Sequence, residues 1–430
     1  MSIIEKILKP VSLPRIVKVA QFFNTEQLRG DLAEYVGMQI KAIPSYQRIR
    51  PGQRIAVTGG SRGIHRVAEV TRIVCNLVKE KGAEPFVIPA MGSHGGATPE
   101  GQIKMLESIG ITEDSVGAPI CAAMDTVEIG SFDLGRRIPV HMDKFAHNAD
   151  GIILINRIKS HPSFRAKYES GLMKMMAIGL GKQFGAQHYH QLGYGKFPYI
   201  IEAAGRLVLQ QENILFGVAL LENSSGKLRK VVCLETEKIP EKEPELLKES
   251  YRYLARPFFT EADVLVVRDV GKNISGACCD VNVSGRFNNE YYHNEMKITR
   301  VAFLRLTPQS HGNASGVGVA DIITDRLYHD IDLMQSYPNG LTTGSTVAYK
   351  IPMIMPTEEL AVRAAVKTSL IPDYSEVRMC LVESSKNLDH FYVTENLLQQ
   401  ATGSDVKMEI ISEPMEIPFT DAGELALDFA

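Results

Sequence analysis

Four residues have types and surroundings that could transfer a proton or hold a metal ion. His94 lies in a glycine-rich turn, and His161 lies in the loop that follows a short apolar run. Lys174 lies within a methionine-rich apolar segment, and His190 follows sixteen residues later. An imidazole titrates near neutral pH, so each histidine could take or give a proton or ligate a metal. Two such histidines could act as a pair of bases, one on each face of a planar intermediate.

Each of these residues also has an interpretation that involves no chemistry. His94 could be a solvated loop histidine. Lys174 could belong to a buried helix and extend its ammonium group toward water. His188 and His190 could be surface residues, and their i, i+2 spacing is expected to put them on one face of a strand or extended loop without requiring a metal. The residue types alone therefore leave both interpretations open.

The segment Thr58-Gly-Gly-Ser-Arg-Gly63 resembles the cofactor loop of short-chain dehydrogenases, in which glycines let backbone amides approach a pyrophosphate. The resemblance is partial, because His65 stands where that family has its third glycine and no Tyr-x-x-x-Lys motif follows. We interpret the segment as an anion-binding loop. Ser61 and Arg62 belong to it, and the planar guanidinium of Arg62 suits a phosphate or a carboxylate.

The elements that must position these residues follow an alternating pattern. Short apolar runs predict buried strands, and apolar residues at helical spacing predict helices between them. Loops that are polar, glycine-rich or histidine-bearing follow the carboxyl ends of the predicted strands, which is the edge of a parallel sheet where ligands bind. The predicted strands are 54–57, 85–90, 151–156 and 262–267, the predicted helices are 66–80, 170–180 and one that opens at Thr98-Pro99, and the loops are 58–63, 92–97, 157–161 and 271–276.

The length of 430 residues exceeds the size at which a single hydrophobic core keeps growing, so two α/β domains with parallel-sheet cores are expected. A charged, proline-containing stretch at 235–248 is interpreted as a surface crossing between them, with a helix inside it as the alternative. We predict an N-terminal domain over 1–255 and a C-terminal α/β domain over 256–430.

Composition narrows the class of ligand. The 47 basic and 50 acidic residues give a formal charge of −3, which does not favour a nucleic-acid or membrane-surface partner, so small molecules are the expected ligands. The six cysteines show no metal-binding spacing and indicate a reducing compartment. Since no signal peptide or spanning apolar segment is recognisable, a cytoplasmic protein is expected.

The order of the candidate residues resembles that of the lactate racemase superfamily, whose members use a nickel-pincer nucleotide. That family has a histidine in a Gly-x-His loop, a second histidine after the third strand, a Ser-Gly-x-x-Lys motif, and a histidine sixteen residues after the lysine. The corresponding elements occur here in the same order, as Gly92-Ser-His94, His161, Ser170-Gly-Leu-Met-Lys174 and His190.

The resemblance implies an isomerase, a racemase or epimerase that inverts the C2 carbinol of a 2-hydroxy acid or sugar acid. It makes His94 and His161 the two acid–base residues. Lys174 becomes the residue joined covalently to the cofactor, and His190 becomes the protein ligand of the nickel. The N-terminal domain is then the catalytic and cofactor-binding domain, and the active site lies in the interdomain cleft.

Further residues receive roles from the same resemblance. Ser61, Arg62 and Lys272 would bind the cofactor, and Arg62 and Lys272 would also hold the substrate, with Lys272 contributed by the C-terminal domain. The implied partners are a small 2-hydroxy acid or sugar acid and the enzymes that synthesise the cofactor.

The sequence departs from the family pattern at three points. His94 is followed by Gly-Gly where lactate racemases more often have Arg-Pro, and the interval of thirteen residues from His161 to Lys174 is slightly long. The chain also has no tryptophan, whereas the lactate enzymes place one near the substrate. We therefore expect the chemistry to be retained and the substrate to be larger than lactate.

Two other classes of function compete with this one. An NAD(P)-dependent oxidoreductase is favoured only by the glycine-rich loop at 58–63. A non-catalytic homologue that binds a nucleotide or hydroxy acid would have no use for two opposed bases. The presence of His94, His161, Lys174 and His190 together argues against it.

Overall fold

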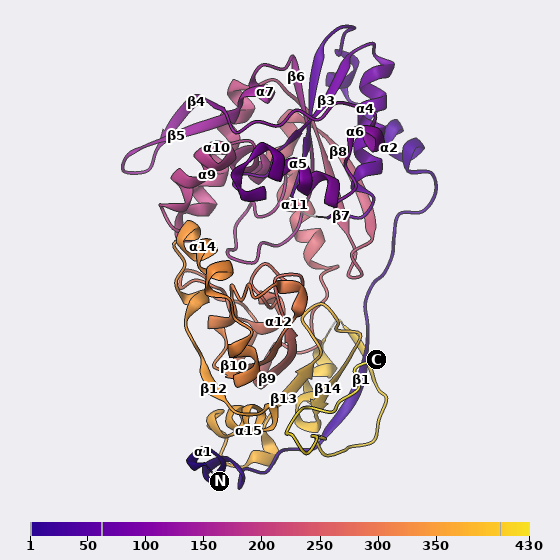
Figure 1. The fold of residues 1–430 in the computed structure, drawn as a ribbon. Helices are drawn as coiled ribbons and strands as arrows, with labels where there is room; N and C mark the ends of the chain where they lie inside the picture. The colour runs from indigo at the N-terminus through magenta and orange to yellow at the C-terminus, as the bar shows by residue number, and fades with distance from the viewer. Residues whose placement is uncertain (1, 62, 405) are drawn as a thin grey trace. The chain divides into compact units, whose positions relative to one another are not determined.

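The computed structural model describes residues 2–61, 63–404 and 406–430 and divides into two compact units (Figure 1). Asn24–Leu254 form the N-terminal unit, and Met1–Phe23 together with Ala255–Ala430 form the C-terminal unit. Both are built from helices and parallel-rich sheets, so the mixed α/β class is as predicted. The prediction that residues 1–255 form one domain is wrong for the first 23, because β1 (Ile16–Phe22) pairs with strands near the C-terminus.

The N-terminal unit contains a five-stranded sheet in the order β3-β2-β6-β7-β8. Its first four strands run parallel, and β8 pairs antiparallel with β7. The three strands predicted in this part of the chain are present, close to their predicted bounds. The strands are β2 (Arg54–Gly59), β3 (Glu84–Pro89), β6 (Gly151–Arg157), β7 (Ile214–Glu222) and β8 (Leu228–Glu235).

The order of the strands creates a switch point between β2 and β6. The chain passes from β2 to β3 on one side, and the next strand of the sheet, β6, lies on the other side of β2. In open parallel sheets the loops at the carboxyl ends of two such strands diverge and leave a crevice for ligands. The loop after β2 contains Ser61, and the segment after β6 contains His161, so both follow the strands that border this point.

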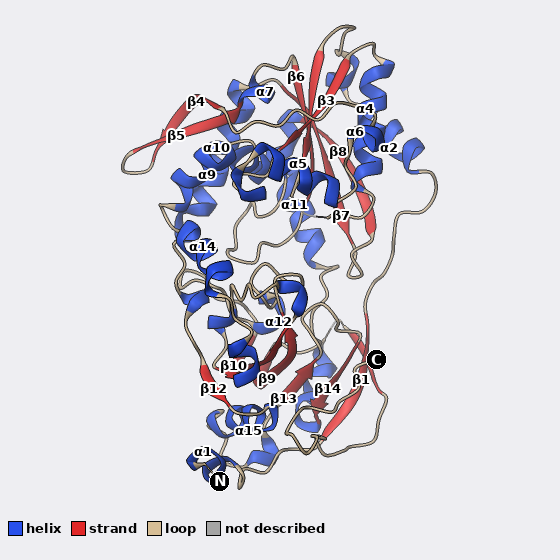
Figure 2. Ribbon diagram, viewed as in Figure 1, coloured by secondary structure: helices blue, strands red, loops and turns tan. Residues whose placement is uncertain are grey.

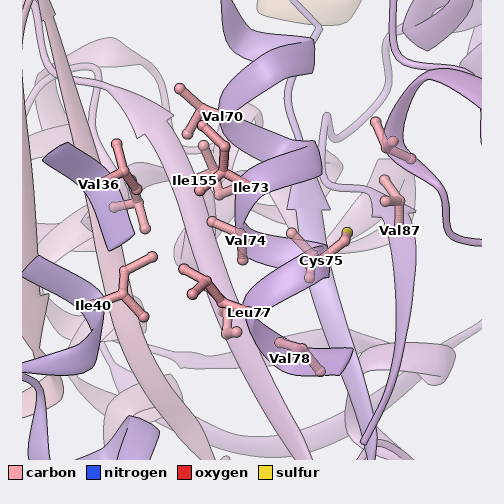
Figure 3. Close-up of a cluster of buried hydrophobic side chains, with 14 of the residues drawn as sticks. Val36, Ile40, Val70, Ile73, Val74, Cys75, Leu77, Val78, Val87 and Ile155 are labelled. Atoms are coloured by element: carbon pink, nitrogen blue, oxygen red, sulfur yellow. The ribbon is translucent and has the colours of Figure 1, made fainter. Parts of the chain in front are cut away.

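One face of the sheet is covered by α2 (Leu32–Lys41) and α4 (Val67–Glu80). Val70, Val74 and Leu77 of α4 recur at helical spacing and face the buried cluster drawn in Figure 3. Ile155 of β6 lies in the same cluster. The predicted helix over 66–80 is confirmed, since burial of this apolar stripe stabilises it against the sheet.

A second group of helices packs against β6 and β7 and against one another. It includes α8 (Leu172–Lys174), its continuation η2 (Met175–Gly179), α10 (Phe197–Gln211) and α11 (Ile239–Tyr251). The segment at 235–248, interpreted as a surface crossing, instead lies largely in η4 (Thr236–Lys238) and α11, whose Ile239, Leu246 and Leu247 are buried. The helix named as the alternative is the one observed.

The remaining elements of this unit are short helices and one hairpin. Thr98 caps α5, as predicted, by accepting the backbone N–H of Gly101. The hairpin of β4 and β5 projects from its unit in Figure 2. These elements are β4 (Thr126–Asp133), β5 (Arg137–Asp143), α3 (Pro44–Gln47), η1 (Gly95–Ala97), α5 (Pro99–Ser108), α6 (Glu113–Val116), α7 (Lys144–His147), α9 (Lys182–His190) and η3 (Tyr194–Lys196).

The C-terminal unit contains an eight-stranded sheet in the order β12-β11-β10-β9-β13-β14-β1-β15. The strands from β12 to β13 are parallel, and the last three pair antiparallel. Besides β1, they are β9 (Glu261–Val270), β10 (Lys297–Leu306), β11 (Ile322–Thr324), β12 (Met353–Met355), β13 (Met379–Val382), β14 (His390–Thr394) and β15 (Lys407–Ile410).

Both faces of this sheet are buried. Leu265 and Val267 of β9 belong to one apolar cluster and Val264 and Val266 to another, as expected when successive side chains point to opposite faces. The helices are α1 (Ile3–Leu8), α12 (Val281–Ser284), η5 (Pro308–Ser310), η6 (Val317–Val319), α13 (Asp325–His329), α14 (Leu333–Thr343), η7 (Val347–Tyr349), α15 (Glu358–Thr368), η8 (Tyr374–Glu376) and η9 (Glu395–Gly403). Among the residues described, no helix is both long and apolar enough to cross a bilayer.

Candidate functional site

His94 is held beside the loop that follows β2. Its Nδ1 lies 2.5 Å from the Ser61 hydroxyl, a hydrogen bond between the loops that follow two neighbouring parallel strands. The Ala90 N–H donates to the Gly59 carbonyl and holds the ends of β2 and β3 together, and the Gly92 N–H donates to the Gly179 carbonyl and ties the His94 turn to η2. His94 itself is exposed, and the hydrogen bond to Ser61 helps to position its ring.

A buried polar network also holds the turn that carries His94. The Gln102 side-chain amide donates to the carbonyls of Gly92 and His94, at 2.9 and 3.3 Å. Lys182 in turn donates to the Gln102 amide oxygen at 3.1 Å and pairs with the Asp143 carboxylate at 2.9 Å. Both side chains of the ion pair are fully buried, and burial lowers the pKa of Lys182. The network therefore fixes the His94 turn from within the protein.

The segment that carries His161 forms a closed loop. Lys159 and Ser170 pair in antiparallel fashion through two backbone hydrogen bonds of 2.9 and 3.1 Å. Inside the loop, the buried Glu169 carboxylate accepts the backbone N–H of His161 at 2.6 Å. His161 lies two residues after one end of this pairing, and Lys174 lies four residues after the other. The pairing thus joins the two segments from which His161 and Lys174 follow.

The ring of His161 stacks on Phe164, with 4.2 Å between the ring centroids. Its Nδ1 accepts the backbone N–H of Ser163 at 3.1 Å, so the proton of the neutral ring is on Nε2. Burial lowers the pKa of His161 well below its ordinary value, and the charges of Lys174, Lys159 and Arg165 lower it further. The ring is therefore neutral at pH 7.

Lys174 lies where the α-helix changes its hydrogen-bonding pattern. It ends α8, and the next five residues, Met175–Gly179, form a π-helical turn. Single π-helical turns inside α-helices are rare and frequently occur at functional sites. The Lys174 Nζ lies 6.0 Å from the centroid of the Phe164 ring, on which His161 also packs.

His190 ends α9 and packs against Phe197, with 5.1 Å between the ring centroids. Its Nδ1 is buried and has no hydrogen-bond partner among the described residues. Burial, followed by the charge of Lys174, lowers the pKa of His190 to about 4. At neutral pH this imidazole is uncharged and keeps a lone pair available to a ligand.

His161, Lys174 and His190 therefore belong to one cluster. Phe164 contacts His161 and Phe197, and Phe197 contacts His190. The charge of Lys174 lowers the pKa of both histidines, which places all three within electrostatic reach of one another. The His94 turn is linked to this cluster through the hydrogen bond from Gly92 to Gly179, the last residue of the π-helical turn.

His188 differs from His190 in its surroundings. We expected both on one face of a strand or extended loop, which is wrong because α9 is a helix, and two residues of a helix differ by about 200° in direction. His188 is half-buried and packs with Phe184 and His141 instead. The helix thus separates the two histidines, and only His190 faces the cluster.

Two further predicted site residues are Lys272 and Arg62. Lys272 belongs to the C-terminal unit, where it follows β9 and its Nζ donates to the Gly276 carbonyl at 2.9 Å. Arg62, predicted to bind the cofactor and substrate, lies outside the described residues. Within the described ranges, no three His, Cys, Asp or Glu side chains gather closely enough to hold a metal ion.

Several residues that support the site gave no local signal in the sequence. Glu169 holds the His161 loop, and Gln102 and Lys182 hold the His94 turn. Glu243 of α11 accepts the backbone N–H of Met173 at 2.9 Å, one residue before Lys174. Gly171 belongs to the Ser-Gly-x-x-Lys motif. A larger residue would not fit at this position, because a Cβ there would overlap the Glu243 carboxylate.

No protein-family model matches the chain, and the comparison with curated proteins found no match. Among solved structures, the chain is similar to the lactate racemase apoprotein from Thermoanaerobacterium thermosaccharolyticum. The likeness has a TM-score of 0.43 and 13% sequence identity and covers 66% of this chain and 68% of that chain. At these values it does not establish an activity for this chain.

Proposed function

We propose that this chain is a racemase or epimerase that inverts the C2 carbinol of a 2-hydroxy acid or sugar acid with a nickel-pincer nucleotide. The observation that carries the proposal is the cluster of Lys174, His161 and His190 around Phe164 and Phe197. The cluster contains the Lys174 amine, which could be the covalent attachment point of the cofactor, and the two neutral imidazoles of His161 and His190. The three residues occur in the order that the family pattern requires.

The residues present fit such a cofactor. A pincer nucleotide supplies most of the donor atoms to its own nickel, and the protein would supply one imidazole. His190 has a buried Nδ1 without a described partner and is neutral at pH 7, the form in which histidine binds metals. A single neutral nitrogen donor also suits a site where no larger cluster of ligating side chains is described.

When bound, the cofactor supplies an acceptor for the substrate hydride, and the protein moves the hydroxyl proton. His94 and His161 are the proposed proton-transfer residues. The Ser61 hydroxyl can donate to or accept from His94 Nδ1, so it supports the ring in both protonation states. His161 receives a backbone N–H at Nδ1 and thus presents Nε2–H to the substrate oxygen. To accept the substrate's hydroxyl proton at Nε2, the ring would first have to carry its own proton on Nδ1 instead of Nε2, which requires the Ser163 N–H to release Nδ1.

The other predicted residues would bind charge. Arg62 and Lys272 would hold the substrate carboxylate or the cofactor phosphate, because guanidinium and ammonium groups donate charge-assisted hydrogen bonds to anionic oxygens. In this proposal Ser61 orients His94 and also contributes to the cofactor loop. A substrate larger than lactate is favoured by the absence of tryptophan from the chain.

The test is to produce the chain together with the cofactor-synthesis enzymes and to measure its nickel content, absorbance spectrum and mass. We expect a covalent adduct mapped to Lys174 and about one nickel per chain. His190→Ala should lose the nickel, whereas His188→Ala, two residues away on the side of the same helix that packs with Phe184 and His141, should keep it. No adduct in the parent chain, or equal loss of nickel in both variants, would overturn the proposal.

A further inference from the structure

Helix α11 holds the polypeptide on both sides of the cluster, although none of its side chains takes part in the proposed chemistry. Tyr251 donates its hydroxyl to Glu169 in the His161 loop at 2.9 Å. The Tyr168 hydroxyl donates to the Pro240 carbonyl of α11 at 2.8 Å. Between these two contacts, Glu243 reaches the backbone before Lys174.

Glu243 is a carboxylate in an unusual place. Its side chain is fully buried, its Oε2 accepts the N–H of Met173 at 2.9 Å, and its Oε1 has no hydrogen-bond partner among the described residues. Burial raises the pKa of Glu243 to about 7, and its hydrogen bonds to the backbone of Met173 and Leu172 oppose that rise. Burying a carboxylate costs free energy, so a methionine or leucine here would serve packing better.

The motif before Lys174 is shaped around this carboxylate. Gly171 leaves the space that the carboxylate fills, and its carbonyl accepts the Asn156 side-chain amide at 2.8 Å. The amides of Leu172 and Met173 open the helix and have no partners within it, so an acceptor from elsewhere must satisfy them. Glu243 supplies that acceptor from a different helix, and Lys174 is the next residue along the chain.

We propose that Glu243 is a positioning residue for Lys174. Its carboxylate holds the first turn of α8 and thereby fixes the direction in which the Lys174 amine points. The inference rests on the proposed role of Lys174 as the attachment point of the cofactor, but the contact itself belongs to the apoprotein and can be measured there.

The test compares Glu243→Gln with Glu243→Met. Glutamine keeps an acceptor oxygen for Met173, whereas methionine has a similar length and no acceptor. The readout is the acetylation rate of Lys174 in the apoprotein by a succinimidyl acetate reagent, mapped by mass spectrometry and divided by the rate at the exposed Lys104. A merely structural role would move the melting temperature but not this ratio.

We expect the Lys174/Lys104 ratio to rise about three- to tenfold in Glu243→Met, as for the loss of one buried hydrogen bond, and to remain near the parent value in Glu243→Gln. Tyr251→Phe is the matched control, since it removes the hydrogen bond of α11 to Glu169 in the His161 loop and should leave the ratio unchanged. If Glu243→Met does not fold, Gly171→Ala, which displaces the carboxylate sterically, should raise the ratio in its place.

An unchanged ratio in the folded Glu243→Met variant, or an equal change in Glu243→Gln, would overturn the inference. The outcome is independent of the proposed function, because the labelling needs no cofactor. A second experiment uses protein produced with the cofactor-synthesis enzymes. An adduct in the parent, together with about a threefold or greater loss of adduct in Glu243→Met, would support both the proposed function and the positioning role of Glu243. No adduct in the parent would refute the proposed function and leave the labelling result intact.

Discussion

Replacing Lys182 with methionine tests whether the His94 turn depends on a buried ion pair. Lys182 and Asp143 are fully buried at 2.9 Å, and Lys182 also donates to the Pro89 carbonyl at 2.6 Å and to Gln102. The φ angle of Lys182 is +53°, a strained value that methionine would share, so the substitution changes mainly the head group. The variant leaves the Asp143 carboxylate buried without its cation.

The expected cost follows from that uncompensated charge. Removing one partner of a buried ion pair destabilises a protein by about 3–5 kcal/mol. For a unit of this size each kcal/mol lowers the melting temperature by roughly 2–4 °C, so Lys182→Met should melt about 6–20 °C below the parent. Because Gln102 loses one of its contacts, the amides of the His94 turn should also exchange faster with solvent.

Scanning calorimetry and hydrogen exchange measure both effects. The matched control is the double variant Asp143→Asn with Lys182→Met, which removes both charges and should recover most of the lost stability, since a neutral pair of similar volume often replaces a buried ion pair without loss. If Lys182→Met melts within about 2 °C of the parent, or if the double variant melts as low as the single one, the buried pair does not support this unit as described.

Three further predictions concern the Lys174 side of the site. Gly171→Ala should destabilise the protein by about 1–3 kcal/mol in urea unfolding, because the added Cβ overlaps Glu243; equal stability would show that the carboxylate can move aside. The pKa of Glu243 is raised from 4.5 to about 7, so its stabilising contribution is present below pH 4.5 and is lost as the pH rises to 7. Relative to Glu243→Gln, the parent should lose about 3 kcal/mol of unfolding free energy across that window, and parallel pH profiles would refute the shift. Nitrogen NMR of the apoprotein at pH 7 should show His161 neutral, with its proton on Nε2 and Nδ1 unprotonated; a ring protonated on Nδ1 would contradict the hydrogen bond from Ser163.

The parts of the fold that local pattern determines were predicted well. Apolar periodicity located β2 and α4, and Thr98 followed by Pro99 located the start of α5. The loops that carry Ser61 and His161 were predicted at strand ends, and the sheet order places those ends at a switch point. These features depend on residues close in sequence, which is why sequence reasoning reaches them.

Other features depend on contacts between distant segments and could not be predicted. The first strand, β1, pairs with β14 and β15. No residue near β1 in the sequence indicates that it belongs to the C-terminal sheet. The separation of His188 from His190 required knowing that residues 182–190 are helical, although their apolar content is low. The roles of Gln102 and Glu243 arise from packing between helices and strands far apart in the chain.

The central claim is that His94 and His161 act as two bases on opposite faces of one substrate. The most direct measurement is turnover by His94→Ala and His161→Ala, each loaded with cofactor and started separately from each enantiomer of a 2-hydroxy acid that the parent inverts. Each variant should lose inversion in both directions by a factor on the order of 10²–10⁴, the contribution typical of a proton-transfer residue, while its cofactor spectrum stays intact. If either variant inverts either enantiomer at close to the parent rate, the two-base account is wrong.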